Sequence, residues 1–99
     1  MSYPALDRLD WGSVRESDGE NIVISFSGIS PRHIAIIPRE VLEDGLRTTN
    51  EAPIRSAEAH KAEVMSAIAK ALEERDWREL VNIDTGETLF QLWIMRRHF

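Results

Sequence analysis

The strongest periodic pattern in the chain runs from Ile54 to Arg75. Read at 100° per residue, one arc of this segment is apolar and the opposite arc is polar, as in an amphipathic helix. No Pro or Gly occurs in it and alanine is frequent, so the pattern predicts one helix of 22 residues, about 33 Å long. Its first part, from Ala57 to Lys61, is small and polar enough that we expect it to be partly exposed. The apolar arc consists of Ala57, Val64, Met65, Ile68, Ala69, Ala71 and Leu72.

Several shorter segments alternate between apolar and polar residues, which is typical of β-strands with one buried face. Asp18-Gly19 suits a tight turn between the first two segments, and Asp84-Thr85-Gly86 suits a turn between the last two. The predicted strands are Val14–Ser17, Ile22–Phe26, Arg32–Ile37, Glu79–Ile83 and Glu87–Arg96.

A second, shorter helix is predicted over Arg39–Asp44. Pro38 suits the first turn of a helix and Gly45 suits its end. The polar residues that follow predict a loop from Leu46 to Pro53, before the long helix begins. At the other end of the long helix, Asp76-Trp77 are expected to close its last turn.

The final strand is unusual because both of its faces are apolar. Phe90, Leu92 and Ile94 point to one side, and Leu89, Trp93 and Met95 to the other. A helix packed on the sheet covers one of these faces, so the second face needs a cover of its own. Two covers are open: another protein chain, or the N-terminal apolar residues Leu6, Leu9 and Trp11.

Together these elements predict an α+β fold, in which an antiparallel sheet of four to five strands carries one long helix packed on one face. Residues 1–99 fit a single domain, since a chain of 99 residues has no room for a second core. Neither an internal repeat nor a linker-like segment is present in the sequence.

Composition narrows the functional classes. The net charge of −5 argues against nucleic acid and anionic membranes as partners, because both are polyanions. The sequence contains no cysteine, which excludes disulfides and thiolate chemistry. The N-terminus lacks the basic and apolar regions of a signal peptide, and no apolar run is long enough to span a membrane. We therefore expect a cytoplasmic protein.

Motifs that would identify a catalytic, cofactor or metal site are lacking. His60 and Glu63 could form half of a metal site, but two ligands do not hold zinc. We therefore predict no catalytic residues, no cofactor and no metal. Arg96-Arg97-His98, with Arg32-His33 near it, is the one basic cluster in the sequence. It is either an anion or acidic-partner site, or a charged strand end that discourages edge pairing.

The order of elements also resembles that of a small bacterial family, domain of unknown function 1488. The resemblance rests on Trp11, the two strands Ile22–Phe26 and Ile34–Ile37, the segment Pro-Arg-Glu-Val-Leu-Glu-Asp at 38–44, and the alanine-rich helix. It covers most of residues 10–90 and implies two strands and a short helical turn that lead into one long helix and a closing strand. The family has no established activity, so the resemblance assigns no residue a role.

These observations lead us to expect a non-catalytic protein-interaction protein that forms a homodimer. Aromatic and methionine residues are enriched in the cores of protein interfaces, which points to the second face of the last strand. The alternative is a regulatory or phage-encoded inhibitor that binds a larger protein complex, and an enzyme is the third hypothesis. The residues expected to bind the partner are Leu89, Trp93, Met95, Arg96 and Arg97.

Overall fold

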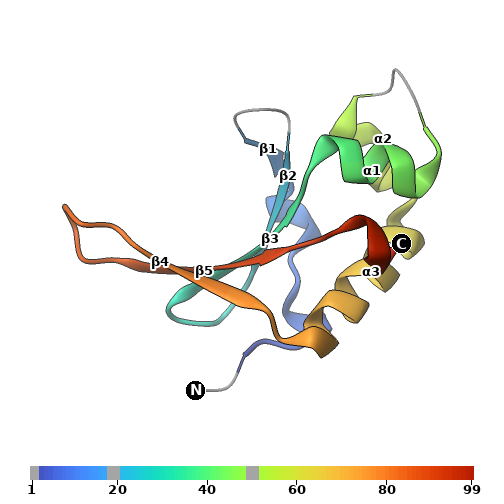
Figure 1. Ribbon diagram of the computed structural model, residues 1–99. Helices are drawn as coiled ribbons and strands as arrows, with labels where there is room; N and C mark the ends of the chain where they lie inside the picture. The colour runs from blue at the N-terminus through green and yellow to red at the C-terminus, as the bar shows by residue number, and fades with distance from the viewer. Residues whose placement is uncertain (1–2, 18–20, 49–51) are drawn as a thin grey trace.

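The computed structural model of the protein describes residues 3–17, 21–48 and 52–99. At its centre is a five-stranded sheet with strand order β1-β2-β3-β5-β4 (Figure 1). The predicted α+β fold is therefore confirmed. The strands are β1 (Arg15–Glu16), β2 (Ile22–Phe26), β3 (Arg32–Ile37), β4 (Trp77–Val81) and β5 (Thr88–Trp93). The helices are α1 (Arg39–Leu46), α2 (Pro53–Ala59) and α3 (Lys61–Glu74), with single 3-10 turns η1 (Leu6–Arg8), η2 (Trp11–Ser13) and η3 (Arg96–His98).

The sheet is mixed, which corrects the prediction of an antiparallel one. β2 pairs antiparallel with β1 and β3, and β4 pairs antiparallel with β5. β3 and β5 run parallel, with Ala35 opposite Leu92. Parallel neighbours need a long crossover, and the helices between β3 and β4 provide it by carrying the chain to the far edge of the sheet. The alternation of apolar residues is the same in both kinds of pairing, so the sequence pattern could not distinguish them.

The predicted C-terminal hairpin is present as β4 and β5. Gly86 adopts φ 74° in its turn, a backbone conformation that glycine adopts without steric cost. In Figure 1 the tip of this hairpin extends away from the helices. The N-terminal hairpin is also present, as β1 and β2, whereas its predicted turn at Asp18-Gly19 lies outside the described residues.

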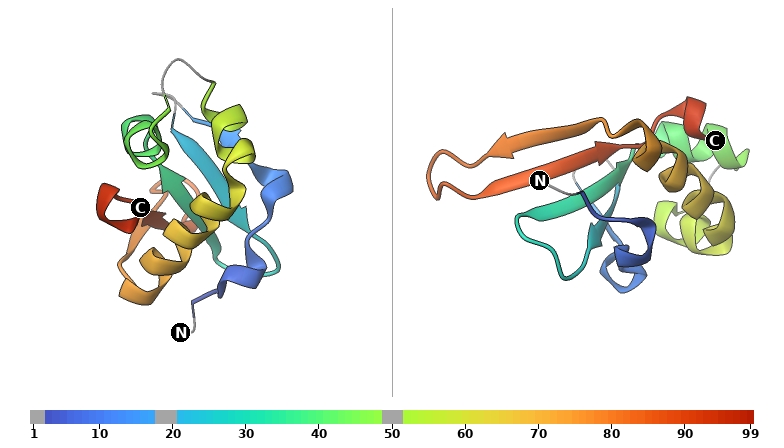
Figure 2. Two further views of the ribbon diagram at one scale, coloured as in Figure 1. Left: turned by 90° about the vertical axis from the view of Figure 1, so that its right-hand side faces the viewer. Right: turned by 90° about the horizontal axis from the view of Figure 1, so that it is seen from below.

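The predicted long helix is two helices, α2 and α3, separated at His60. His60 has φ −116° and ψ 39°, and its carbonyl accepts the N–H groups of Glu63 and Val64 at the start of α3. α2 contacts β1, whereas α3 crosses the sheet (Figure 2). Each helix therefore buries a different row of its side chains. Helix propensity remains high through the break, so the sequence could not reveal it. Similarly, α3 ends at Arg75 with φ 55°, and Trp77 begins β4 instead of closing the helix.

The main core lies between the sheet and the helices. The segment from Ala57 to Lys61 is partly exposed, as expected: Glu58, Ala59 and Lys61 are exposed, whereas Ala57 is buried in this core. Leu6, Leu9 and Trp11 also pack here, on the side of the sheet that α3 covers. The N-terminal segment therefore caps the main core. The strands contribute Ile22, Ile24, Phe26, Ala35, Ile37 and Leu92, Ile94 follows β5, and α3 contributes Val64, Ala67, Ile68 and Ala71.

Gly45 lies inside α1 and does not end it, which corrects a further prediction. The helix continues to Leu46 and ends at Arg47, whose φ of 57° is left-handed. A Cβ atom at position 45 would lie 2.7 Å from both Cδ atoms of the Phe99 ring. Glycine is therefore present here because the C-terminal ring packs directly against the backbone of α1, a reason that the local sequence does not contain.

Candidate protein-docking face

The face of the sheet opposite α3 carries a second apolar cluster, and we call this side the open face. Pairing between strands aligns Val23, Ile36 and Trp93 in one row across it. Val23, Ile34 and Ile36 are buried in the cluster, and Leu89 and Trp93 are partly buried at its edge. None of the described helices contributes a residue to this cluster. Of the two covers that the sequence left open, the N-terminal segment therefore packs on the other face.

The indole of Trp93 is oriented along the open face. Its Nε1–H donates a hydrogen bond to Oε1 of Gln91, at 3.2 Å, and both residues belong to β5. Leu80 of the neighbouring strand β4 pairs with Leu89 and is 49% exposed. The apolar strip of the open face, formed by Leu80, Leu89 and Trp93, therefore extends onto β4. A groove of about 770 Å³ runs beside this strip, between the turn before β3 and the hairpin.

Arginines stand around the apolar cluster. Arg15 pairs with Val23, Arg32 with Leu89, and Arg78 with Gln91, so strand alternation places all three arginines on the open face. The acidic residues within the strands, Glu16 and Glu79, alternate to the opposite face. The sheet surface is therefore apolar and basic on the open side.

Two of these arginines converge on one hydroxyl group. Arg15 Nη1 donates to Ser25 Oγ at 3.5 Å, and Arg32 Nη2 donates to the same oxygen at 3.3 Å. Ser25 lies on β2, between the strands that carry the two arginines. Sequence analysis did not identify Arg15, Ser25 or Arg78 as site residues. Alternation along each strand is the signal that could have placed them on one face, once the strand order was known.

The five residues expected to bind a partner are divided between two places. Leu89 and Trp93 lie on the open face. Met95 lies beyond the end of β5, where its backbone N–H donates to Nδ1 of His98 at 2.8 Å. Arg96 is exposed at the start of η3. Arg97 is turned toward α3, so the structure does not gather these residues into a single surface.

Arg97 and His98 hold the C-terminal turn against the end of α3. Arg97 donates to both carboxylate oxygens of Glu74, at 2.8 and 3.3 Å, and His98 Nε2 lies 3.0 Å from Oε1 of Glu74. Since His98 Nδ1 accepts the backbone N–H of Met95, its Nε2 carries the proton and donates. Hydrogen bonds from Arg97 and then His98 lower the pKa of Glu74 to about 2. This contact is an anchor for the C-terminus.

The basic cluster that the sequence suggested does not form. Arg32 pairs with Leu89 at the start of β5, whereas Arg96 follows its end, roughly 13 Å or more along the strand. His33 is 1% exposed and stacks on Phe90, with ring centroids 4.8 Å apart. His33 is therefore a core residue, and only Arg32 of that pair reaches the surface.

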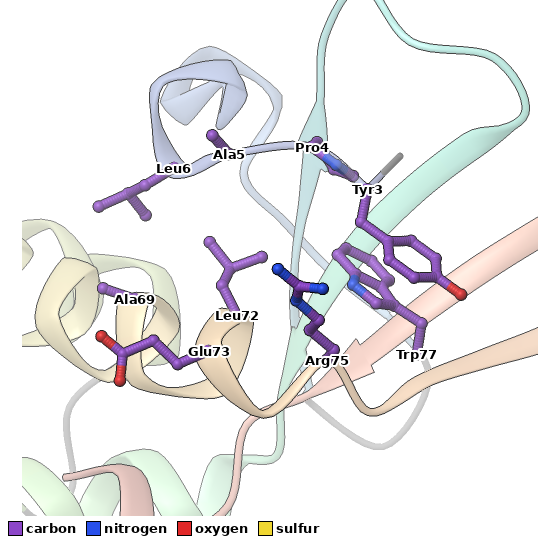
Figure 3. Close-up of a pocket in the computed structure, with 9 residues that line it drawn as sticks. All are labelled: Tyr3, Pro4, Ala5, Leu6, Ala69, Leu72, Glu73, Arg75 and Trp77. Atoms are coloured by element: carbon purple, nitrogen blue, oxygen red, sulfur yellow. The ribbon is translucent and has the colours of Figure 1, made fainter. Parts of the chain in front are cut away.

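A cavity of about 720 Å³ lies on the helix side, between the N-terminal segment and the end of α3 (Figure 3). Tyr3 stacks on Trp77 at its wall, with centroids 5.5 Å apart. Among the described residues, Trp77 Nε1 and the neighbouring His33 Nε2 have no hydrogen-bond partner. Glu73 and Arg75 also line the cavity. No constellation of reacting groups among the described residues faces it.

His60 Nδ1 lies 3.5 Å from Oε2 of Glu63. Within residues 3–17, 21–48 and 52–99, no group of three or more His, Cys, Asp or Glu side chains is placed to hold a metal ion. In the same part of the chain, no helix is both long enough and apolar enough to cross a membrane.

Comparison of the chain with family models, with curated proteins and with solved structures gives no match. The resemblance to the family of unknown function 1488 therefore stays a prediction.

Proposed function

We propose that this protein is a non-catalytic interaction protein that docks another protein on its open face. The observation that carries the proposal is the cluster around Val23, Ile34 and Ile36, which is apolar yet covered by none of the described helices. Parallel strands are normally covered on both faces, and the parallel pair β3–β5 runs through this cluster. A protein partner would cover Leu89 and Trp93, which remain partly exposed at the edge of this cluster.

A second copy of the chain is the first candidate for that partner. Trp93 and Leu89 supply the aromatic and aliphatic surface that homodimer interfaces use. A stable dimer requires about 800 Å² of buried surface from each chain, and the chain has an accessible surface of 6076 Å² in all.

A regulatory protein that binds a larger complex is the second candidate. The observation that favours it is the extended hairpin, on which Leu80, Val81 and Ile83 are 49%, 55% and 96% exposed. Exposed aliphatic side chains on an extended hairpin suit insertion into a groove of a larger protein.

Light scattering over a range of concentrations, combined with two matched variants, tests both candidates. Trp93→Ser removes the aromatic group of the open face, and Ile83→Ser changes the hairpin tip and leaves that face intact. If the protein is a homodimer through the open face, Trp93→Ser gives a monomer and Ile83→Ser stays dimeric. A wild-type protein that is monomeric at high concentration contradicts the homodimer.

Binding to a larger complex is tested by affinity capture of the tagged protein from the cells that make it. Capture lost in Ile83→Ser but kept in Trp93→Ser would place the contact on the hairpin. The opposite result would place it on the open face. Equal capture by both variants and the wild type would refute both surfaces.

Absence of catalysis is part of the same proposal. Glu74 and Arg97, whose pKa values are shifted, are joined to each other in the C-terminal anchor and do not line the cavity of Figure 3. We also propose a cytoplasmic location, which the acidic composition and the lack of cysteine support.

A further inference from the structure

The open face carries positive charges that are not paired with any acidic side chain of the described residues. Arg15 and Arg32 both donate to Ser25 Oγ, and no described acidic side chain forms an ion pair with either of them or with Arg78. Two guanidinium groups within hydrogen-bond reach of one neutral oxygen repel each other. A carboxylate placed above Ser25 would accept hydrogen bonds from both and remove that repulsion.

The surroundings of Ser25 define what must accompany such a carboxylate. Ser25 is paired with Ile34, and its neighbour in the adjacent row is Val23. Trp93 is on β5, two strands away from Ser25 and two residues further along the strand direction. The spacing between strands and the rise per residue place it roughly 12 Å from Ser25. A partner with an acidic group over Ser25 would therefore pass over the buried Ile34 and place an apolar group on the partly exposed Trp93.

An amphipathic helix has the required geometry. A separation of roughly 12 Å corresponds to about eight residues along a helix, so an acidic residue at position i and apolar residues at i+4 and i+8 would face the sheet together. A helix is also the element that ordinarily covers the second face of parallel strands.

We propose that the open face binds an acidic amphipathic helix of another protein, with a carboxylate of that helix seated between Arg15 and Arg32. This inference rests on the proposed function of the open face. It disfavours a two-fold contact between copies of this chain, because each copy would bring the same arginines to the interface. Nucleic acid is disfavoured by the net charge of −5 and by the aliphatic character of the cluster.

Binding is measured with two fluorescein-labelled 18-residue peptides designed as helices. Both carry leucine at i+4 and i+8, and they differ only in glutamate or lysine at position i and the flanking positions. We expect the glutamate peptide to bind and to shift the NMR signals of Val23, Ile34, Ile36 and the Trp93 indole. The lysine peptide should bind at least tenfold more weakly, and added salt should weaken the glutamate complex.

Charge variants locate the contact. Arg15→Gln with Arg32→Gln should weaken binding of the glutamate peptide at least tenfold. The matched control, Arg55→Gln with Lys70→Gln, removes the same charge from exposed positions outside the open face and should change it less than twofold. All four positions are exposed, so circular dichroism should show the same fold in both variants.

Three results would overturn the inference. The first is equal binding of the two peptides, and the second is shifts confined to the helix side of the sheet. The third is tighter binding of an 18-residue oligothymidine than of the glutamate peptide. If binding depends on Trp93 but not on the arginines, the acidic helix is refuted while the open face remains a docking surface. If neither peptide binds and light scattering shows a dimer that Trp93→Ser dissociates, the inference fails and the proposed function stands.

Discussion

The contact between Gly45 and Phe99 gives the sharpest test of the packing. Gly45→Ala places a methyl group 2.7 Å from both Cδ atoms of the Phe99 ring, closer than carbon atoms approach one another. The Phe99 ring must therefore swing away from α1 and leave the partly buried position that it occupies. The substitution therefore has two opposing effects: it removes the packing of the Phe99 ring, and it replaces glycine with alanine, which favours the helix.

The two effects can be compared in magnitude. Burial of a whole phenylalanine side chain contributes about 1.5–3 kcal/mol, so loss of the partly buried Phe99 costs about 2 kcal/mol. Replacing glycine by alanine within a helix stabilises it by about 1 kcal/mol. The lost ring contact therefore outweighs the gain in helix stability. We expect Gly45→Ala to lower the free energy of unfolding by about 1 kcal/mol, which is the difference between the two effects.

Removal of the ring should reverse the sign. In a Phe99→Ala background, Gly45→Ala has only the helix effect and should raise the free energy of unfolding by about 1 kcal/mol. Urea unfolding of the four proteins, followed by tryptophan fluorescence, completes this double-mutant cycle. If Gly45→Ala stabilises the protein with Phe99 present, the ring does not pack against α1 and the explanation for Gly45 is wrong.

Two further measurements test the core and the C-terminal anchor. Ile68→Ala, at a residue of α3 with no exposed surface, should lower the free energy of unfolding by about 2–5 kcal/mol in urea, and a loss under about 1 kcal/mol would contradict the position of α3. Because the pKa of Glu74 falls from 4.5 to about 2 on folding, its stabilising contribution is present above pH 4.5 and is lost as the pH falls toward 2. Acid titration should therefore show a shallower loss of stability over that pH range in Glu74→Gln than in the wild type, and parallel curves would show that the anchor does not form.

The position of most elements could be predicted from local patterns. Ile22–Phe26 and Arg32–Ile37 have the same bounds in the structure as in the prediction, since alternation marks a strand wherever one face is buried. Gly86 was placed correctly in its turn because its positive φ is a local requirement. These features depend on residues close together in the chain.

The errors concern contacts between distant residues. The break at His60 follows from α2 and α3 packing on different parts of the fold, and the glycine at 45 follows from the ring at 99. The parallel pairing of β3 and β5 follows from a crossover of about 50 residues, which no short window of sequence contains. The candidate site shows the same division: Leu89 and Trp93 were identified from their own strand, whereas Arg15 and Ser25 were missed because their role depends on strand order.

Both the sequence and the structure raise the question of what covers the second apolar face of β5. The sequence required a second cover for this strand, and the structure assigns both α3 and the N-terminal segment to the other face. A partner for the last strand could therefore be proposed from that strand alone. The chemistry of that partner could not, because the arginines that define it come from β1, β3 and β4 and meet only when the strands pair. The proposal of an acidic partner therefore rests on the assembled sheet and not on any single strand.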